Sequence, residues 1–287
     1  MSITLRVRLR DVFEGFPRPR PGRPGDPGLF GPETMVWRVN GEGLTALGGG
    51  RALLMQIAHP LVAAGVADHS DFEANAFARL WRTLDAALTV AFGDGEQATA
   101  VSRRVTEVHR RVTGRRGDRT YSALDPELLL WVHATLVDSA LVAYERFVDP
   151  LTPAERERYY QEMKGFAAAF SVPVEVLPNR LADFDRYLDE TVARLEVSGE
   201  ARRLAGEILR PPVPLPLLPV RQAFGMITAG LLPGRLRAAY GLPWSPAREA
   251  ALEAAARILR GSRRHLPPGA LAWPHAKVAL TRLGPDG

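Results

Sequence analysis

Residues 126–147 constrain the fold of this chain more than any other part of the sequence. Asp125, Pro126 and Glu127 form a strong helix start, with a capping carboxylate, a proline at the first helical position and an acid in the first turn. On a wheel of about 100° per residue, the apolar side chains then point in nearly every direction: Leu128, Leu129, Val132, Leu136, Val137, Ala140 and Leu141. A helix that is apolar nearly all round must be wrapped by other helices. His133 lies within it and is therefore predicted to be interior.

The rest of the sequence also favours helices. Alanine, leucine and arginine recur at helical spacing and strand signals are scarce, so the fold class is predicted to be all-α. We expect a single-domain bundle of about eight to ten helices, globin-like in character. Besides 126–147, helices are expected at 50–66, 76–92, 96–113, from Thr152 onward, and at 179–195, 198–210, 221–231 and 245–261.

Proline and glycine mark the parts of the chain that are not expected to be helical. Residues 1–36 include FPRPRPGRPGDPGLFGPET and are predicted to be an irregular N-terminal arm, followed by one helical domain over 37–287. PPVPLPLLP at 211–219 is expected to be an extended linker. Pro60 biases His59 away from helical geometry, so a kink or break is predicted there.

Composition and motif content exclude several kinds of chemistry. The chain has no cysteine, which removes disulfides, zinc–thiolate sites, iron–sulfur clusters and thiolate nucleophiles. None of the six histidines stands in the Glu-x-x-His or His-Glu-x-x-His spacing of di-iron bundles and zinc proteases. The 37 basic residues are dispersed among 32 acidic ones without a recognition-helix motif, so no nucleic-acid partner is expected.

We expect a cytoplasmic protein without a transmembrane segment. Arginines interrupt the first residues, MSITLRVRLRDVF, where a secretory peptide needs an apolar stretch. The longest stretch of low charge, 52–67, is too short to span a bilayer and contains Gln56, His59 and Pro60. The sequence leaves the oligomeric state open.

His109 lies on the rim of the apolar face of its predicted helix. Four valines form the stripe of this face: Val101, Val105, Val108 and Val112. His109 lies roughly 70–80° from the centre of the stripe. One ring nitrogen could meet a cofactor while a backbone or carboxylate acceptor fixes the other. The alternative is a hydrogen-bonded histidine at the boundary of the core.

Arg79 and Arg82, followed by Thr83, form a second constellation. At this spacing both guanidinium groups share one helix face and could clamp a doubly charged anion, such as haem propionates, or a carboxylate substrate. The alternative is a solvated basic face, and the apolar neighbours Trp81 and Leu84 argue against it.

Four stretches occur in an order that is specific when taken together: QIAHPLVAAGVADHSDF, RLWRTL, VHRRVTG and YSALDPELLLWVHATL. The later stretches LLPGRLRAAYGLPWSPARE and HLPPGALAWPHAKVAL fit the same pattern, which covers residues 37–280. The pattern resembles the rubber oxygenases, also called latex clearing proteins, and a fungal oxygenase of mycophenolic acid biosynthesis.

The resemblance implies an all-α protein that holds one haem b. His109 matches the proximal iron ligand of the rubber oxygenases. Arg79, Arg82 and Thr83 match their distal Arg-x-x-Lys-Thr motif, with Arg82 in place of the lysine. Arginine stays protonated and cannot ligate iron. Arg79 is therefore expected to anchor a propionate, and Arg82 and Thr83 are the expected catalytic residues, with Arg82 also binding the cofactor.

His59 and His133 complete the expected surroundings of the haem as cofactor-binding or pocket residues. His59 stands beside the predicted break, where it could either satisfy freed carbonyl groups or line a pocket. The distal glutamate of the rubber oxygenases has no assignable counterpart, because the helix around residues 59–67 carries no acid.

These features predict a haem b-dependent oxygenase that uses dioxygen on an apolar, unsaturated or isoprenoid substrate. The missing base and the altered distal motif favour an alternative, a non-catalytic protein that binds haem or another apolar ligand. A third reading, a transcriptional regulator with a helical ligand pocket, would need a helix-turn-helix module that the proline-rich arm does not provide.

Overall fold

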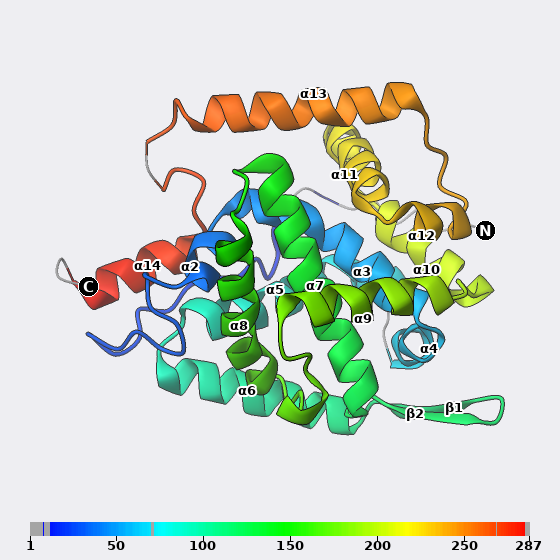
Figure 1. The fold of residues 1–287 in the computed structure, drawn as a ribbon, viewed down its shortest axis with the longest axis horizontal. Coiled ribbons are helices and arrows are strands. Elements are labelled where there is room, and N and C mark those ends of the chain that lie inside the picture. The colour runs from blue at the N-terminus through cyan, green and yellow to red at the C-terminus, as the bar shows by residue number, and fades with distance from the viewer. Residues whose placement is uncertain (1–7, 9–11, 70–71, 268, 285–287) are drawn as a thin grey trace.

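The computed structural model describes residues 8, 12–69, 72–267 and 269–284, with the backbone alone for 72–76. Within these residues the fold is all-α, as predicted, with one small two-stranded sheet (Figure 1). The α-helices are α2 (Met35–Asn40), α3 (Gly49–Ala58), α4 (Pro60–His69), α5 (Phe72–Phe92), α6 (Gly95–Arg110), α7 (Pro126–Phe147), α8 (Pro153–Ala169), α9 (Leu181–Arg194), α10 (Gly199–Leu209), α11 (Leu218–Leu231), α12 (Gly234–Ala239), α13 (Pro246–Arg263) and α14 (Pro274–Leu283). Short 3₁₀ helices are η1 (Gly43–Gly48), η2 (Val174–Val176) and η3 (Leu215–Leu217).

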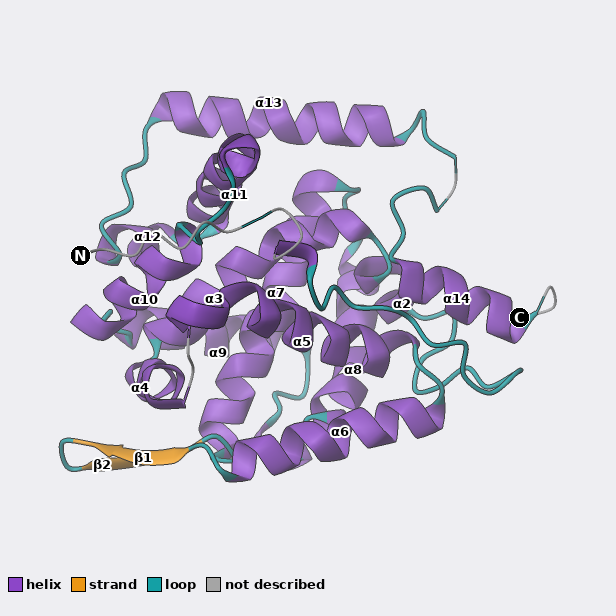
Figure 2. Ribbon diagram, turned by 180° about the vertical axis from the view of Figure 1, so that it is seen from behind, coloured by secondary structure: helices purple, strands orange, loops and turns teal. Residues whose placement is uncertain are grey.

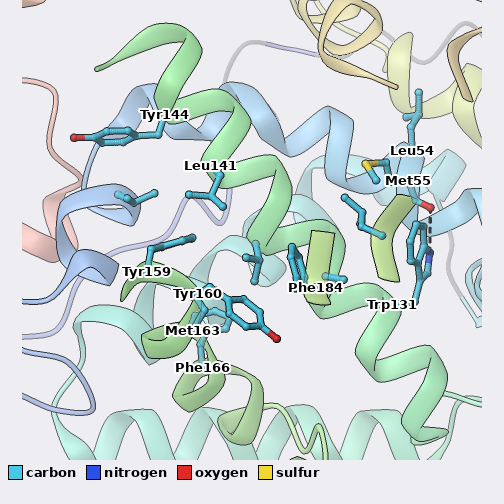
Figure 3. Close-up of a cluster of buried hydrophobic side chains, with 14 of the residues drawn as sticks. Leu54, Met55, Trp131, Leu141, Tyr144, Tyr159, Tyr160, Met163, Phe166 and Phe184 are labelled. Atoms are coloured by element: carbon cyan, nitrogen blue, oxygen red, sulfur yellow. Dashed lines mark hydrogen bonds between the residues drawn. The ribbon is translucent and has the colours of Figure 1, made fainter. Parts of the chain in front are cut away.

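Helix α7 runs through the middle of the molecule and is wrapped by the others, which confirms the prediction from its sequence (Figures 1 and 2). Its start is also as predicted, because the Asp125 carboxylate accepts a hydrogen bond from the backbone N–H of Glu127 at 2.9 Å. The Trp131 indole donates to the carbonyl oxygen of Met55 on α3 at 3.2 Å (Figure 3). The largest core cluster gathers round this helix and includes Tyr159, Tyr160 and Phe184 (Figure 3).

Length and composition would allow α7 to cross a membrane, and no other single helix in the described residues meets that test. However, 67% of its apolar stretch is buried inside the protein, which is typical of a core helix. Among the residues that the structure describes, the only other stretch that meets the test is η1 and α3 taken with α4, and this pair is bent by 103° at His59. The predicted break at Pro60 is therefore confirmed, and it divides the expected helix 50–66 into α3 and α4.

Residues 113–122 form a β-hairpin, and its first residue, Thr113, lies in the predicted helix 96–113. Strand β1 (Thr113–Arg116) pairs antiparallel with β2 (Arg119–Ser122), and the hairpin projects from the molecule beyond the end of α6 (Figure 2). Gly117 adopts a φ of 57°, which the first central position of a two-residue hairpin turn requires. The expected helix 96–113 therefore ends at Arg110.

The proline-rich segments differ in how they match the predictions. The part of the N-terminal arm from residue 16 to 34 is irregular, and the Arg23 backbone N–H donates to the Asp94 carboxylate at 2.6 Å, which ties it to the turn between α5 and α6. The segment 211–219 is not wholly extended, because η3 forms within it and α11 begins at Leu218. Pro219 stands in the first turn of α11, where its missing N–H costs nothing.

Candidate functional site

Helices α5 and α6 form an antiparallel pair, and this pair determines how far along the helix axes Arg79 and His109 lie from each other. The Asp94 side chain caps α6 by accepting from the Gln97 backbone N–H at 2.8 Å. Farther along, Arg104 and Asp85 form an ion pair across the two helices at 3.7 Å. The helices run in opposite directions. Arg79 lies six residues before Asp85 and His109 lies five residues after Arg104, so both are displaced from the ion pair in the same direction along the helix axes, by about 9 and about 7.5 Å. This register brings the Arg79 and His109 positions to the end of the pair away from the turn.

The imidazole of His109 is partly buried, as its place on the rim of the apolar face predicts. Its Nδ1 atom is buried and makes no hydrogen bond to the described residues. Burial lowers the pKa of His109, because desolvation disfavours the charged ring. The ring is therefore neutral at neutral pH, with a lone pair available to a ligand. Val108, expected in the apolar stripe, is instead exposed.

Arg79 differs in exposure from Arg82 and Thr83. Arg79 is partly buried, and desolvation, followed by repulsion from Arg82, lowers its pKa to about 10. Arg79 thus remains a cation at neutral pH. Arg82 and Thr83 are exposed. The predicted catalytic role of Arg82 and Thr83 remains a prediction. Helix α5 faces solvent at these two positions.

Burial also lowers the pKa of the two other predicted histidines. His59 has its Nδ1 buried without a hydrogen bond from the described residues, and its pKa is lowered by burial and by Arg119, against a smaller opposing effect of Asp125. His133 is 4% exposed, with a buried Nε2 that has no partner in the described residues. Burial lowers the pKa of His133 to about 4.

Helix α4 links the parts of the chain that carry these histidines. At its C-terminal end, a ring nitrogen of His69 lies 3.0 Å from the carbonyl oxygen of Thr113, four residues after His109. At its N-terminal end, Leu61 packs in one cluster with Leu128 of α7. The α4 helix therefore runs from the start of α7 to the end of α6, and His59 directly precedes it.

A polar network that the sequence did not predict holds the hairpin against α4. The Tyr121 hydroxyl donates to the Asp68 carboxylate at 2.5 Å, and Arg116 contacts the same carboxylate at 2.5 Å and Glu200 of α10 at 3.2 Å. Burial and the hydrogen bond to Asp68 raise the pKa of Tyr121 to about 12. Asp68 is the only acid of α4, so the network occupies the one carboxylate that the helix could contribute to a site.

Two further observations define the site and its limits. Within the part of the chain that the structure describes, no three His, Asp or Glu residues cluster as a metal-binding group. His275 on α14 is a further buried histidine outside the predicted site residues, and neither of its ring nitrogens bonds to the described residues.

The burial of His133 predicts a pH effect on stability. Its pKa is lower in the folded protein than in the unfolded chain, so unfolding takes up a proton between about pH 6.5 and pH 4. The free energy of unfolding should be unaffected by this group above pH 6.5 and fall by about 1.4 kcal/mol per pH unit below it. Urea unfolding of wild type and His133→Gln across this range checks it. An identical pH dependence in the two proteins would contradict the burial.

Comparison with known proteins identifies the family of this chain. The chain belongs to the family described as "ER-bound oxygenase mpaB/B'/Rubber oxygenase, catalytic domain", which matches residues 37–261. This confirms the resemblance seen in the sequence, and the domain that defines the family is an oxygenase catalytic domain.

Two mycobacterial proteins are similar to the chain over most of its length. They are uncharacterized protein Rv2237 of Mycobacterium tuberculosis and uncharacterized protein Mb2261 of Mycobacterium bovis. Each is 30% identical over 222 residues, which cover 75% of this chain and 87% of the relative. No solved structure matches the chain.

Proposed function

We propose that the protein is a haem b-dependent oxygenase acting with dioxygen on an apolar substrate. The observation that carries the proposal is the buried Nδ1 of His109, which has no hydrogen-bond partner among the described residues, in a ring whose pKa is lowered by burial. A buried polar atom without a partner is costly unless a ligand satisfies the group. The oxygenase family supplies the reaction class. A haem can be attached through one imidazole, and His109 would provide it.

Each candidate side chain has a role that follows from its charge and burial. The neutral ring of His109 would hold the iron. The Arg79 cation, retained in a partly buried position, would bind a propionate. His59 and His133 would each offer the cofactor one buried hydrogen-bonding atom, Nδ1 of His59 and Nε2 of His133, in rings whose pKa is lowered by burial. Haem b, when bound, supplies the iron chemistry that activates dioxygen.

The proposed substrate class follows from the contacts of Asp68 on α4. The one acid of α4, Asp68, is held by Tyr121 and Arg116 and is not free to accept a proton from a substrate. We therefore propose a substrate that needs no strong base, such as an isoprenoid or polyunsaturated chain whose double bond is oxidised. Arg82 and Thr83 are both exposed. Their proposed role is to stabilise negative charge that develops on dioxygen during the reaction.

Dioxygen uptake by the haem-loaded protein tests the oxygenase proposal. With squalene or linoleic acid present, uptake should exceed that of an equal amount of free haem, with carbonyl products formed in proportion. A protein that retains haem but shows no uptake with any unsaturated substrate would instead support the alternative, a non-catalytic haem or apolar-ligand binder. The exposure of Arg82 and Thr83 is the observation that favours this alternative.

A further inference from the structure

The chain between Glu207 and Glu249 has an unusual charge pattern. It contains no acidic residue, although acids and arginines alternate through most of the sequence. It contains five arginines: Arg210, Arg221, Arg235, Arg237 and Arg248. This part of the protein, which covers η3, α11 and α12, therefore carries positive charge without internal compensation from its own residues.

The same part of the chain exposes apolar side chains to solvent. Residues 211–220 consist only of proline, leucine and valine, and we call them the apolar ridge. Leu215 is 79% exposed and Val220 is 63% exposed. Exposed prolines continue the surface between them at Pro216 and Pro219. Single exposed apolar residues are ordinary, but a contiguous apolar surface marks a site of interaction.

Local structure restricts the shape of the apolar ridge. Its prolines restrict the backbone, and η3 and the first turn of α11 form within it. The far end of α11 is anchored in a satellite core, where Ile227 and Leu231 pack with Leu252 of α13. A partner that binds the ridge therefore does not have to order a flexible segment first.

We propose that the apolar ridge docks on a lipid surface that carries anionic headgroups. Leu215 and Val220 would enter the boundary between headgroups and acyl chains, while Arg210 and Arg221, which border the ridge in sequence, would bind phosphates. The charge pattern argues against a second copy of this chain as the partner. A two-fold interface would bring the arginine-bearing surface against itself. The proposal goes beyond the oxygenase function and does not depend on bound haem.

Co-sedimentation with vesicles tests the proposal on the full-length protein. Wild type should bind vesicles of phosphatidylcholine mixed with phosphatidylglycerol, bind much less to phosphatidylcholine alone, and be released by salt. The double variant Leu215→Ser/Val220→Ser should lose about tenfold in affinity for the mixed vesicles. Arg210→Gln/Arg221→Gln should lose at least about tenfold there and little on neutral vesicles.

A matched control separates the ridge from exposed apolar residues in general. Val174→Ser/Leu280→Ser changes two exposed apolar side chains elsewhere, with Val174 69% exposed, and should bind as wild type does. Unchanged urea midpoints would show that all variants are folded. The proposal is overturned if wild type does not bind mixed vesicles, or if the control loses as much affinity as the ridge variant. It is also overturned if light scattering shows a wild-type dimer that the ridge variant breaks.

Discussion

Replacing His109 by alanine is expected to lower the affinity for haem by about 100-fold or more, because losing a ligand should exceed the 10–100-fold cost of disturbing the groups around one. The Soret band of reconstituted protein should be lost or displaced after gel filtration. The change removes the one imidazole in the α5–α6 pair that combines a neutral ring with a buried, unbonded nitrogen. Haem titration followed by absorbance measures the effect.

Two controls make the His109 result specific. His265→Ala removes an exposed histidine and should leave haem binding unchanged. His109→Gly should recover a Soret band when imidazole is added, because the free ring can occupy the vacated space. If His109→Ala binds haem as wild type does and His59→Ala or His133→Ala does not, the assignment of the iron ligand is wrong.

Replacing Arg51 by alanine is expected to lower the free energy of unfolding by about 3–5 kcal/mol, because it breaks a buried ion pair and leaves its partner without compensation. The Arg51 side chain is 5% exposed and contacts Asp138 of α7 at 2.5 Å. It also donates to the Ser139 hydroxyl and to the carbonyl oxygen of Leu231, both at 2.8 Å. One cation therefore ties α3 to α7 and α11.

Urea unfolding of matched variants checks the Arg51 prediction. Arg186→Ala breaks an exposed pair with Asp183 at 3.2 Å and should cost less than about 1 kcal/mol. Arg51→Met/Asp138→Leu removes both charges and should lie closer to wild type than Arg51→Ala does, because no charge stays buried alone. Equal losses in Arg51→Ala and Arg186→Ala would show that the α3 cation does not stabilise the fold as its contacts indicate.

Local signals explain which parts of the fold could be predicted from the sequence. The start of α7 depends on Asp125 and Pro126, and the break after α3 depends on Pro60, so neighbouring residues are sufficient to reveal both. The capping box that opens α8 at Thr152 is also local. The sequence does not predict the hairpin at 113–122, because its two four-residue strands are rich in arginine and lack the alternation of apolar and polar residues that indicates strands.

In the candidate site, too, the features set by local sequence can be predicted and the contacts between distant residues cannot. The positions of His109 at a core boundary and of His133 in the interior follow from helical periodicity. Helical periodicity does not predict that Arg79 is partly buried while Arg82 and Thr83 are exposed. Residues three or four apart share one helix face, and the exposure of each depends on the helices packed against that face. The link between Asp68 and Tyr121 joins residues 53 positions apart, and no local pattern encodes it.

The haem content of the protein tests the central claim most directly. Full-length wild type, supplied with haemin and passed through gel filtration, should retain one haem b per chain, measured as its pyridine complex against protein concentration. The result that would contradict the account is a colourless protein under these conditions, folded by circular dichroism and cooperative in urea.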